Sequence, residues 1–166
     1  DEYGCNFTSV VPTNIYGPFD NFDPNTAMVI PSLISRVVAG ENPLVVWGDG
    51  TAIRDFAFSE DVAEAMMKTI ENKIYTPINL GSGSGYSIKE IVESIVSYFD
   101  EDITVKWDIS KPTGDSKRVM DTTKAKSMGI NLETPIKIGI HKTINWFLEN
   151  KTNINLNERY NSFKEF

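Results

Sequence analysis

The sequence predicts an α/β protein, built as a small α/β lobe together with the end of a larger sheet. Short apolar runs typical of strands alternate with apolar patterns of helical period along most of the chain. The predicted strands are few and short, and long loops separate them, whereas a complete doubly wound domain would supply several parallel βαβ units. With 166 residues, the chain is long enough for one hydrophobic core.

The first predicted elements are a buried strand at residues 7–11 and a loop at residues 12–18. Pro12 ends the strand because proline has no backbone donor for a sheet. The Asn, Gly and Pro residues that follow favour a loop. Open α/β sheets place their ligands where a buried strand ends in such a loop, although an ordinary strand exit has the same pattern.

The next elements are predicted from apolar periodicity and from capping residues. An apolar helical face is predicted from Met28 to residue 38, and Gly40 is expected to end the helix. Strands at 43–47 and 53–58 flank a tight glycine turn. Ser59 is expected to cap a helix that extends to about residue 72.

The remaining elements follow a strand at 77–80. The glycine-rich segment 81–85 precedes a helix at 88–99, for which Ser87 and Glu90 form a capping box. This segment has the position of a phosphate loop but lacks the Walker and G-x-G-x-x-G patterns, so a turn that needs positive φ is favoured. Further elements are predicted as a strand at 103–107, a charged loop at 108–117, short and long helices at 122–127 and 136–148, and a loosely held tail from residue 151.

Composition excludes several classes of function. The net charge of −7 disfavours nucleic acid and anionic membranes as partners, so an anionic ligand would need a local cluster of Arg and Lys. One cysteine forms no internal disulfide, and with one histidine it offers no Cys/His zinc site. No apolar run reaches the roughly 18 residues of a membrane span, and a cytoplasmic protein is therefore expected.

Arginine and lysine side chains near the predicted loops are candidates for anion binding. Arg54 follows a Gly-Asp-Gly turn, and a guanidinium fork matches the geometry of phosphate. Lys111, Lys117 and Arg118 share a loop that Pro and Gly shape, and Arg36 lies on the first helix. For each of these side chains a solvated or salt-bridged surface position is the alternative.

Several short motifs occur in a fixed order between residues 3 and 150. They are Pro12-Thr13-Asn14-Ile15-Tyr16-Gly17-Pro18, Asp20-Asn21-Phe22, Val29-Ile30-Pro31, Trp47-Gly48-Asp49-Gly50 with Arg54-Asp55-Phe56, Asn79-Leu80-Gly81-Ser82-Gly83, and Ser110-Lys111-Pro112 with Gly114, Arg118 and Asp121. Together they resemble the C-terminal half of the extended short-chain dehydrogenase/reductases, most closely the GDP-L-fucose synthase family within them.

This resemblance implies a fold, a cofactor and a substrate class. Residues 1–26 would be the last core strand and active-site loop of a Rossmann-type part, residues 27–150 mainly the substrate-binding lobe, and residues 151–166 a C-terminal tail. The full-length protein would use NADP(H) on a GDP-linked nucleotide sugar and would form a homodimer. The family's catalytic Ser/Thr and Tyr-x-x-x-Lys would lie upstream, so this chain alone is expected to be inactive.

The resemblance also implies site residues. Pro12, Thr13, Asn14 and Ile15 would line the nicotinamide end of the cleft, and Asn14 would also face the sugar. The other substrate-binding residues implied are Val29, Arg36, Trp47, Arg54, Lys111 and Arg118, of which the three arginines and Trp47 would hold the nucleotide diphosphate. Thr113 stands where the family usually has Asp.

Met28 departs from the family pattern most clearly, because it replaces the histidine that serves epimerisation. The resulting prediction is a GDP-4-keto-6-deoxy-sugar reductase. The alternatives are a bifunctional 3,5-epimerase/4-reductase, another epimerase or dehydratase of this fold, and a non-catalytic nucleotide-sugar-binding module.

Overall fold

The computed structural model describes residues 2–99 and 102–152 and confirms the predicted α/β fold. In chain order its elements are β1 (Val10–Pro12), β2 (Asn14–Tyr16), α1 (Val29–Val38), β3 (Leu44–Trp47), β4 (Ile53–Arg54), β5 (Phe56–Phe58), α2 (Ser59–Glu71), β6 (Ile78–Leu80), β7 (Tyr86–Ser87), α3 (Ile88–Val96), β8 (Val105–Asp108), β9 (Lys117–Arg118), α4 (Thr123–Ser127) and α5 (Ile136–Asn150).

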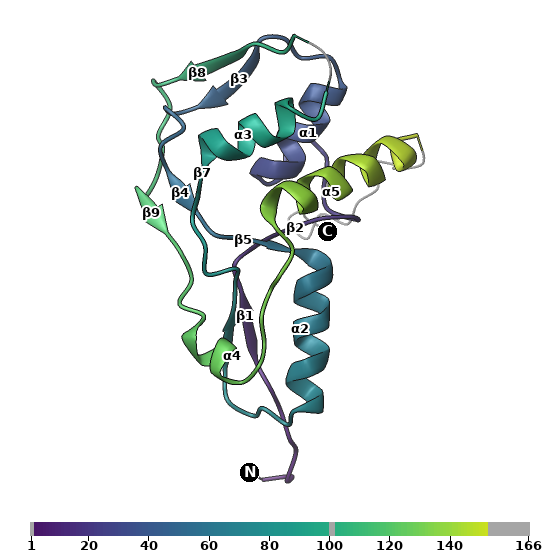
Figure 1. Cartoon of the computed structure of the whole chain (residues 1–166), viewed down its shortest axis with the longest axis vertical. Coiled ribbons are helices and arrows are strands. Elements are labelled where there is room, and N and C mark those ends of the chain that lie inside the picture. Colours follow the sequence, from purple (N-terminus) through teal and green to yellow (C-terminus); the bar gives the residue numbers. More distant parts are fainter. Residues whose placement is uncertain (1, 100–101, 153–166) are drawn as a thin grey trace, which may run out of the picture.

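The strands pair in small, mostly parallel groups. β1 pairs with β6, β2 with β5 and β3 with β8, all in parallel, while β4 lies between antiparallel β7 and parallel β9. Figure 1 shows β1, α2 and α4 towards the end of the molecule where the chain begins, and α1, α3 and α5 grouped at the other end. Parallel pairs need long crossover connections, which the helices provide here.

Two hydrophobic clusters correspond to these two ends. The larger one joins α1, α3 and α5 to β3 and β5, with Ile34, Ile91 and Ile144 fully buried. The smaller one joins α2, β6 and α4 through residues such as Val62 and Ile78. The proposed boundary between residues 26 and 27 stays a prediction.

The prediction for the first strand is wrong in its bounds and in its burial. β1 begins at Val10 and includes Pro12, and the side chains of Phe7 and Val11 are exposed. The backbone geometry explains why proline fits. Ile78 N donates to Ser9 O and Thr13 N donates to Leu80 O, so the odd-numbered residues bond to β6 and the nitrogen of Pro12 faces away from it.

Other boundaries also differ from expectation. Residues 14–16 of the predicted loop form β2, because they pair with β5. The predicted strand 53–58 divides into β4 and β5 around Asp55. Ser59 is not the cap of α2, which starts directly from β5 with Phe58 at the N-cap position.

The helix predictions are otherwise close to the structure. α1 and its closing Gly40, with φ of +83°, are confirmed, although Met28 is an exposed N-cap residue and not part of the buried face. The capping box of Ser87 and Glu90 is confirmed, but α3 ends at Val96. No helix within the described residues has the length and apolar character needed to cross a membrane. The predicted tail lies almost entirely outside the described residues.

Candidate functional site

Five of the predicted site residues line one cavity, which we call the strand-end cavity. Its volume is about 520 Å³, and it opens where β1 passes into β2, beside β4 and β9. Its lining residues are Val11, Pro12, Thr13, Asn14, Arg54, Arg118, Val119 and Met120. The carboxyl ends of parallel strands are where open α/β sheets place their ligands, so the fold provides this position for a site.

Hydrogen bonds to one carbonyl fix the polar side chains on the β1–β2 side of the cavity. Asn14 Nδ2 donates to Asp55 O at 2.7 Å, and Thr13 Oγ1 donates to the same oxygen at 3.2 Å. Both side chains are partly buried. They are therefore held against the link between β4 and β5.

The two arginines also line the strand-end cavity. Arg54 Nη1 donates to Ile53 O at 2.8 Å and to Asp115 O at 2.6 Å, while Nη2 donates to Thr113 O at 3.2 Å. The side chain of Arg118 is 73% exposed, and its Nε lies 3.8 Å from Asp115 Oδ2. Arg54 thus organises the 113–115 loop, and its acceptors within the described residues are uncharged carbonyl groups.

Three further predicted residues, Val29, Arg36 and Trp47, line a different hollow, which we call the helix-side cavity. Its volume is about 780 Å³, and it lies between α1, β3 and the segment before α1. The other lining residues are Pro24, Asn25, Ala27, Ser32, Leu33, Glu41, Val45, Val46 and Ile88. The structure therefore divides the predicted substrate-binding residues between two cavities.

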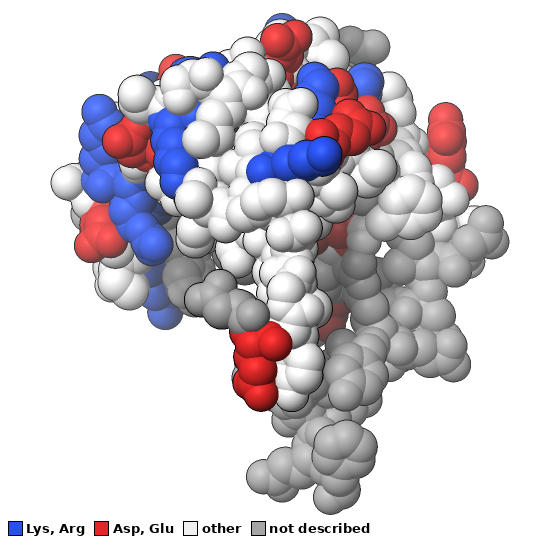
Figure 2. All heavy atoms as spheres, turned by 90° about the horizontal axis from the view of Figure 1, so that it is seen from below, with Lys and Arg blue, Asp and Glu red and all other residues white. Residues whose placement is uncertain are grey.

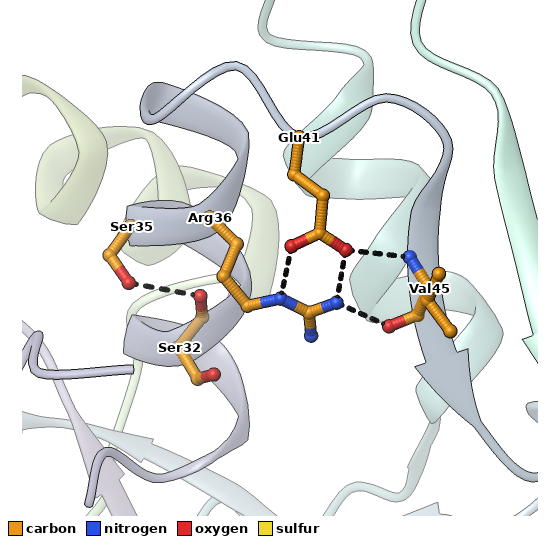
Figure 3. A network of polar contacts seen from close by, with 5 residues as sticks. All are labelled: Ser32, Ser35, Arg36, Glu41 and Val45. Atoms are coloured by element: carbon orange, nitrogen blue, oxygen red, sulfur yellow. Dashed lines mark hydrogen bonds and ion pairs between the residues drawn. The ribbon is translucent and has the colours of Figure 1, made fainter. Parts of the chain in front are cut away.

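A network of polar contacts holds Arg36 in the wall of the helix-side cavity (Figure 3). Its Nε donates to Glu41 Oε2 at 2.7 Å, and its Nη2 donates to Glu41 Oε1 and to Val45 O, both at 2.5 Å. Glu41 Oε1 also accepts from Val45 N at 3.0 Å. The hydrogen bonds from Arg36 hold the pKa of Glu41 below its usual range. In Figure 3 the remaining terminal nitrogen of Arg36 points away from Glu41 and Val45.

Trp47 and Lys111 meet at the rim of the helix-side cavity. Trp47 ends β3 with 64% of its surface exposed, and Lys111 Nζ lies 5.6 Å from the centre of its ring. Such cation–π pairs are weak at exposed sites, about 0.5–1 kcal/mol. The pair places Lys111 against Trp47, whereas Arg118 lies at the strand-end cavity.

Besides Lys111, two predicted residues line neither cavity. Ile15 lines a smaller hollow of about 250 Å³ with Tyr16, Gly17, Pro18, Phe19, Asp20 and Ser59. Met28 is 60% exposed just before α1. Its thioether makes no capping hydrogen bond to the helix.

Asp55 and Glu41 are the polar residues whose roles the sequence did not reveal. Asp55 is fully buried, and its carboxylate accepts from Ser82 N and Gly83 N at 3.1 Å each. These two amides of the glycine segment already donate to Asp55, so they are not free to bind a phosphate. The segment is thus a turn, as predicted. For Glu41 the sequence carried one signal, its position five residues after Arg36 across a helix end.

Basic side chains gather near the strand-end cavity in spite of the net charge of −7. Figure 2 shows a group of Lys and Arg at the left of the view, the side on which β9 lies in Figure 1, and further basic side chains beside acidic ones nearer the centre. β9 and α4 contribute Lys117, Arg118, Lys124 and Lys126. No group of three His, Cys, Asp or Glu side chains in residues 2–99 and 102–152 could hold a metal ion.

Comparison with known proteins gives a family match over the first part of the chain. Residues 1–81 match the model of the NAD dependent epimerase/dehydratase family. This match confirms the resemblance to the extended short-chain dehydrogenase/reductases that the motifs indicate.

Within that class, the chain is similar to GDP-L-fucose synthases. It is 35% identical to "Probable GDP-L-fucose synthase 1" of Oryza sativa subsp. japonica, with 90% of this chain and 47% of the relative covered. It is also 35% identical to the GDP-L-fucose synthase of Escherichia coli (strain K12), with 90% and 51% covered. The structure matches that of a GDP-L-fucose synthetase from Naegleria fowleri bound to NADP, with a TM-score of 0.80, 31% identity, and 88% and 48% coverage. The chain spans about half the length of the curated relatives it matches.

Proposed function

We propose that this chain is the C-terminal, sugar-nucleotide-binding part of an NADPH-dependent reductase that acts on GDP-linked 4-keto-6-deoxy sugars. One observation carries the proposal. Two arginines, Arg54 and Arg118, line one cavity together with Thr13 and Asn14 at the ends of parallel strands. The similarity of the chain to GDP-L-fucose synthases of Oryza sativa and Escherichia coli supports the proposal.

In this proposal the two cavities receive different parts of the ligands. Pro12, Thr13, Asn14 and Ile15 line the nicotinamide end of the cofactor site, and Asn14 also faces the sugar. Arg54 and Arg118 bind the diphosphate, because guanidinium groups form charge-assisted hydrogen bonds with phosphate oxygens. Val29, Arg36, Trp47 and Lys111 border the rest of the nucleotide, and Trp47 offers a ring on which a base can stack.

The cofactor, when bound, supplies the hydride for reduction of the keto group. The chain's own residues bind and orient the nucleotide sugar beside it. We assign no catalytic acid to this chain and infer that the proton donor comes from a part of the protein outside it. The proposal divides the chain into a Rossmann-type part at 1–26, a substrate lobe at 27–150 and a tail at 151–166, in a homodimeric protein.

Ligand-dependent thermal stability tests the binding function. The full-length protein is heated with GDP-, UDP-, CDP- and dTDP-sugars, with and without NADPH. A ligand at 100 times its Kd stabilises the native state by about 2.7 kcal/mol, so a GDP-sugar is expected to raise the Tm most. A larger shift with another nucleotide sugar would refute the preference for GDP. Binding without any NADPH-dependent turnover of 4-keto sugars would instead favour a non-catalytic binding module.

Met28 favours reduction alone over the bifunctional alternative. Epimerisation at C3 and C5 beside a 4-keto group removes a proton from one face and returns a proton to the other, which requires acid and base groups close to both carbons. The thioether of Met28 neither donates nor accepts a proton at neutral pH. The similarity to GDP-L-fucose synthases supports the bifunctional alternative.

A solvent-isotope experiment separates these two activities. The full-length protein is incubated in D₂O with NADPH and the 4-keto sugar, and the product is examined by mass spectrometry and NMR. Reduction at C4 with no deuterium at C3 or C5 is the expected result. Deuterium at both carbons with the L-fuco configuration would establish epimerisation and overturn the assignment to Met28.

A further inference from the structure

Asp55 is a buried carboxylate whose hydrogen-bond partners are all uncharged in the described part of the chain. It lies between β4 and β5 with 0% of its surface exposed. The ion pairs found within residues 2–99 and 102–152 do not include it. Burying a charge is costly unless hydrogen bonds replace its hydration, so the donors around Asp55 are essential to its position.

Four donors from two segments surround the carboxylate. Its Oδ1 accepts from Ser82 N at 3.1 Å and from Ser82 Oγ at 2.6 Å. Its Oδ2 accepts from Gly83 N at 3.1 Å and from Met120 N at 3.2 Å. The side chain therefore ties the glycine turn after β6 to the segment after β9, which lines the strand-end cavity.

The backbone of the same residue holds two more segments. Asp55 N donates to Arg118 O at 3.1 Å, and Asp55 O accepts from the side chains of Thr13 and Asn14. One residue thus bonds to both walls of the strand-end cavity. The Thr13 and Asn14 side is held by the main chain, whereas Met120 is held by the carboxylate.

Gly81 shows that the turn is built around this carboxylate. A Cβ at position 81 would lie 2.6 Å from Asp55 Oδ2 and 2.9 Å from Met120 Cβ. Such distances are far inside van der Waals contact, so only glycine lets the three segments meet here. The glycine at this position therefore serves close packing and not a phosphate.

We propose that Asp55 is a positioning residue for the nucleotide sugar: its carboxylate sets the position of Met120, and so of the cavity wall that follows Arg118, relative to Thr13 and Asn14. This inference rests on the proposed function. A displacement of about 1 Å in a positioning element lowers kcat/KM by about 100-fold. Because the main-chain contacts to Thr13 and Asn14 remain when only the carboxylate is changed, the cofactor side keeps its geometry.

The test compares Asp55→Asn with the unaltered full-length protein. An amide in place of the carboxylate turns one acceptor into a donor that faces other donors. The expected result is a rise of at least about tenfold in KM for the nucleotide sugar, with an unchanged Kd for NADPH. Ser82→Ala removes one of the four donors to the carboxylate, together with the contacts of Ser82 Oγ with Ser84, and a rise of about fivefold is expected. The smaller substitution decides the question if Asp55→Asn does not fold.

Thr143→Val is the matched control, because Thr143 is also fully buried but bonds only to Gly139 O within α5. It is expected to lower the Tm without changing KM. If the Asp55 and Ser82 variants change KM no more than this control does, the positioning role is refuted. If the unaltered protein binds no nucleotide sugar, the proposed function fails first and the inference falls with it.

Discussion

Replacing Glu41 by Gln tests the network that holds Arg36 in the wall of the helix-side cavity. The substitution keeps the shape and one carbonyl acceptor of the side chain but removes its charge. Glu41 accepts two hydrogen bonds from the Arg36 guanidinium and one from Val45 N. The carboxylate is thus the acceptor that orients Arg36.

The expected loss of stability follows from these contacts. A hydrogen bond to a charged group contributes about 1.5–3 kcal/mol. The side chains of Arg36 and Glu41 are 25% and 32% exposed, so solvent screening reduces the charged contribution. Gln retains one of the two contacts with Arg36. We therefore expect Glu41→Gln to lower the free energy of unfolding by about 1–2 kcal/mol at neutral pH.

The effect must depend on pH with a definite sign. The pKa of Glu41 is lower in the folded protein than its ordinary value of 4.5, because Arg36 and Val45 bond to the ionised form. Its contribution to stability is therefore complete above that value and is lost as the pH falls through the lower, folded pKa. The free energy of unfolding in urea is measured for both proteins at pH 7 and at the lowest pH at which they stay folded. The difference between Glu41→Gln and the unaltered protein should be smaller at the low pH.

Glu64→Gln provides the matched control, since Glu64 pairs with Lys68 at 2.7 Å on an exposed face of α2. Its side chain is 66% exposed, and surface pairs of this kind add little to stability. An equal loss in the two variants, or a Glu41→Gln loss that does not shrink at low pH, would refute the reasoning for the Arg36 network.

Three further substitutions test other parts of the structure. Arg54→Ala should weaken binding of the nucleotide sugar roughly 10- to 150-fold by calorimetry with little change for NADPH, and unchanged affinity would remove Arg54 from the diphosphate site. Gly81→Ala should destabilise the protein by about 1–3 kcal/mol in urea, because the new Cβ meets Asp55 Oδ2 at 2.6 Å; a neutral result would mean that the turn relaxes freely. Ser87→Ala should cost about 1 kcal/mol through the lost capping box, whereas Ser84→Ala, outside the helix, should cost less.

Local patterns predicted most of the fold. The capping box at Ser87, the closing Gly40 and the apolar periodicity of α1 are short-range signals, and all three hold in the structure. The first strand was misjudged because apolar composition does not show which face of a strand is covered. Val11 is apolar but exposed within the described chain. Pro12 fits inside β1 because its nitrogen faces away from β6. The sequence alone does not show this direction, since it depends on where the partner strand lies.

The site was predicted only as a set of residue types. Sequence motifs selected Arg36 and Arg54 as equivalent anion ligands, but they line different cavities and have different partners. Asp55 was visible beside Arg54 in the same motif. Its role depends on Ser82 and Met120, which are 27 and 65 residues away in the chain, and no local pattern encodes such contacts.

In the proposed function, the bonding partners of Arg36, Arg54 and Arg118 decide which part of a nucleotide sugar each cavity is expected to bind. The charge of Arg36 is balanced by Glu41, so the helix-side cavity gains little net positive potential from it. Among the described residues, Arg54 bonds to carbonyl groups, and the acidic group that Arg118 meets is an exposed carboxylate at 3.8 Å. Uncharged acceptors orient a guanidinium without cancelling its charge. A dianionic diphosphate is therefore expected at the strand-end cavity, and the uncharged nucleoside beside Arg36 and Trp47.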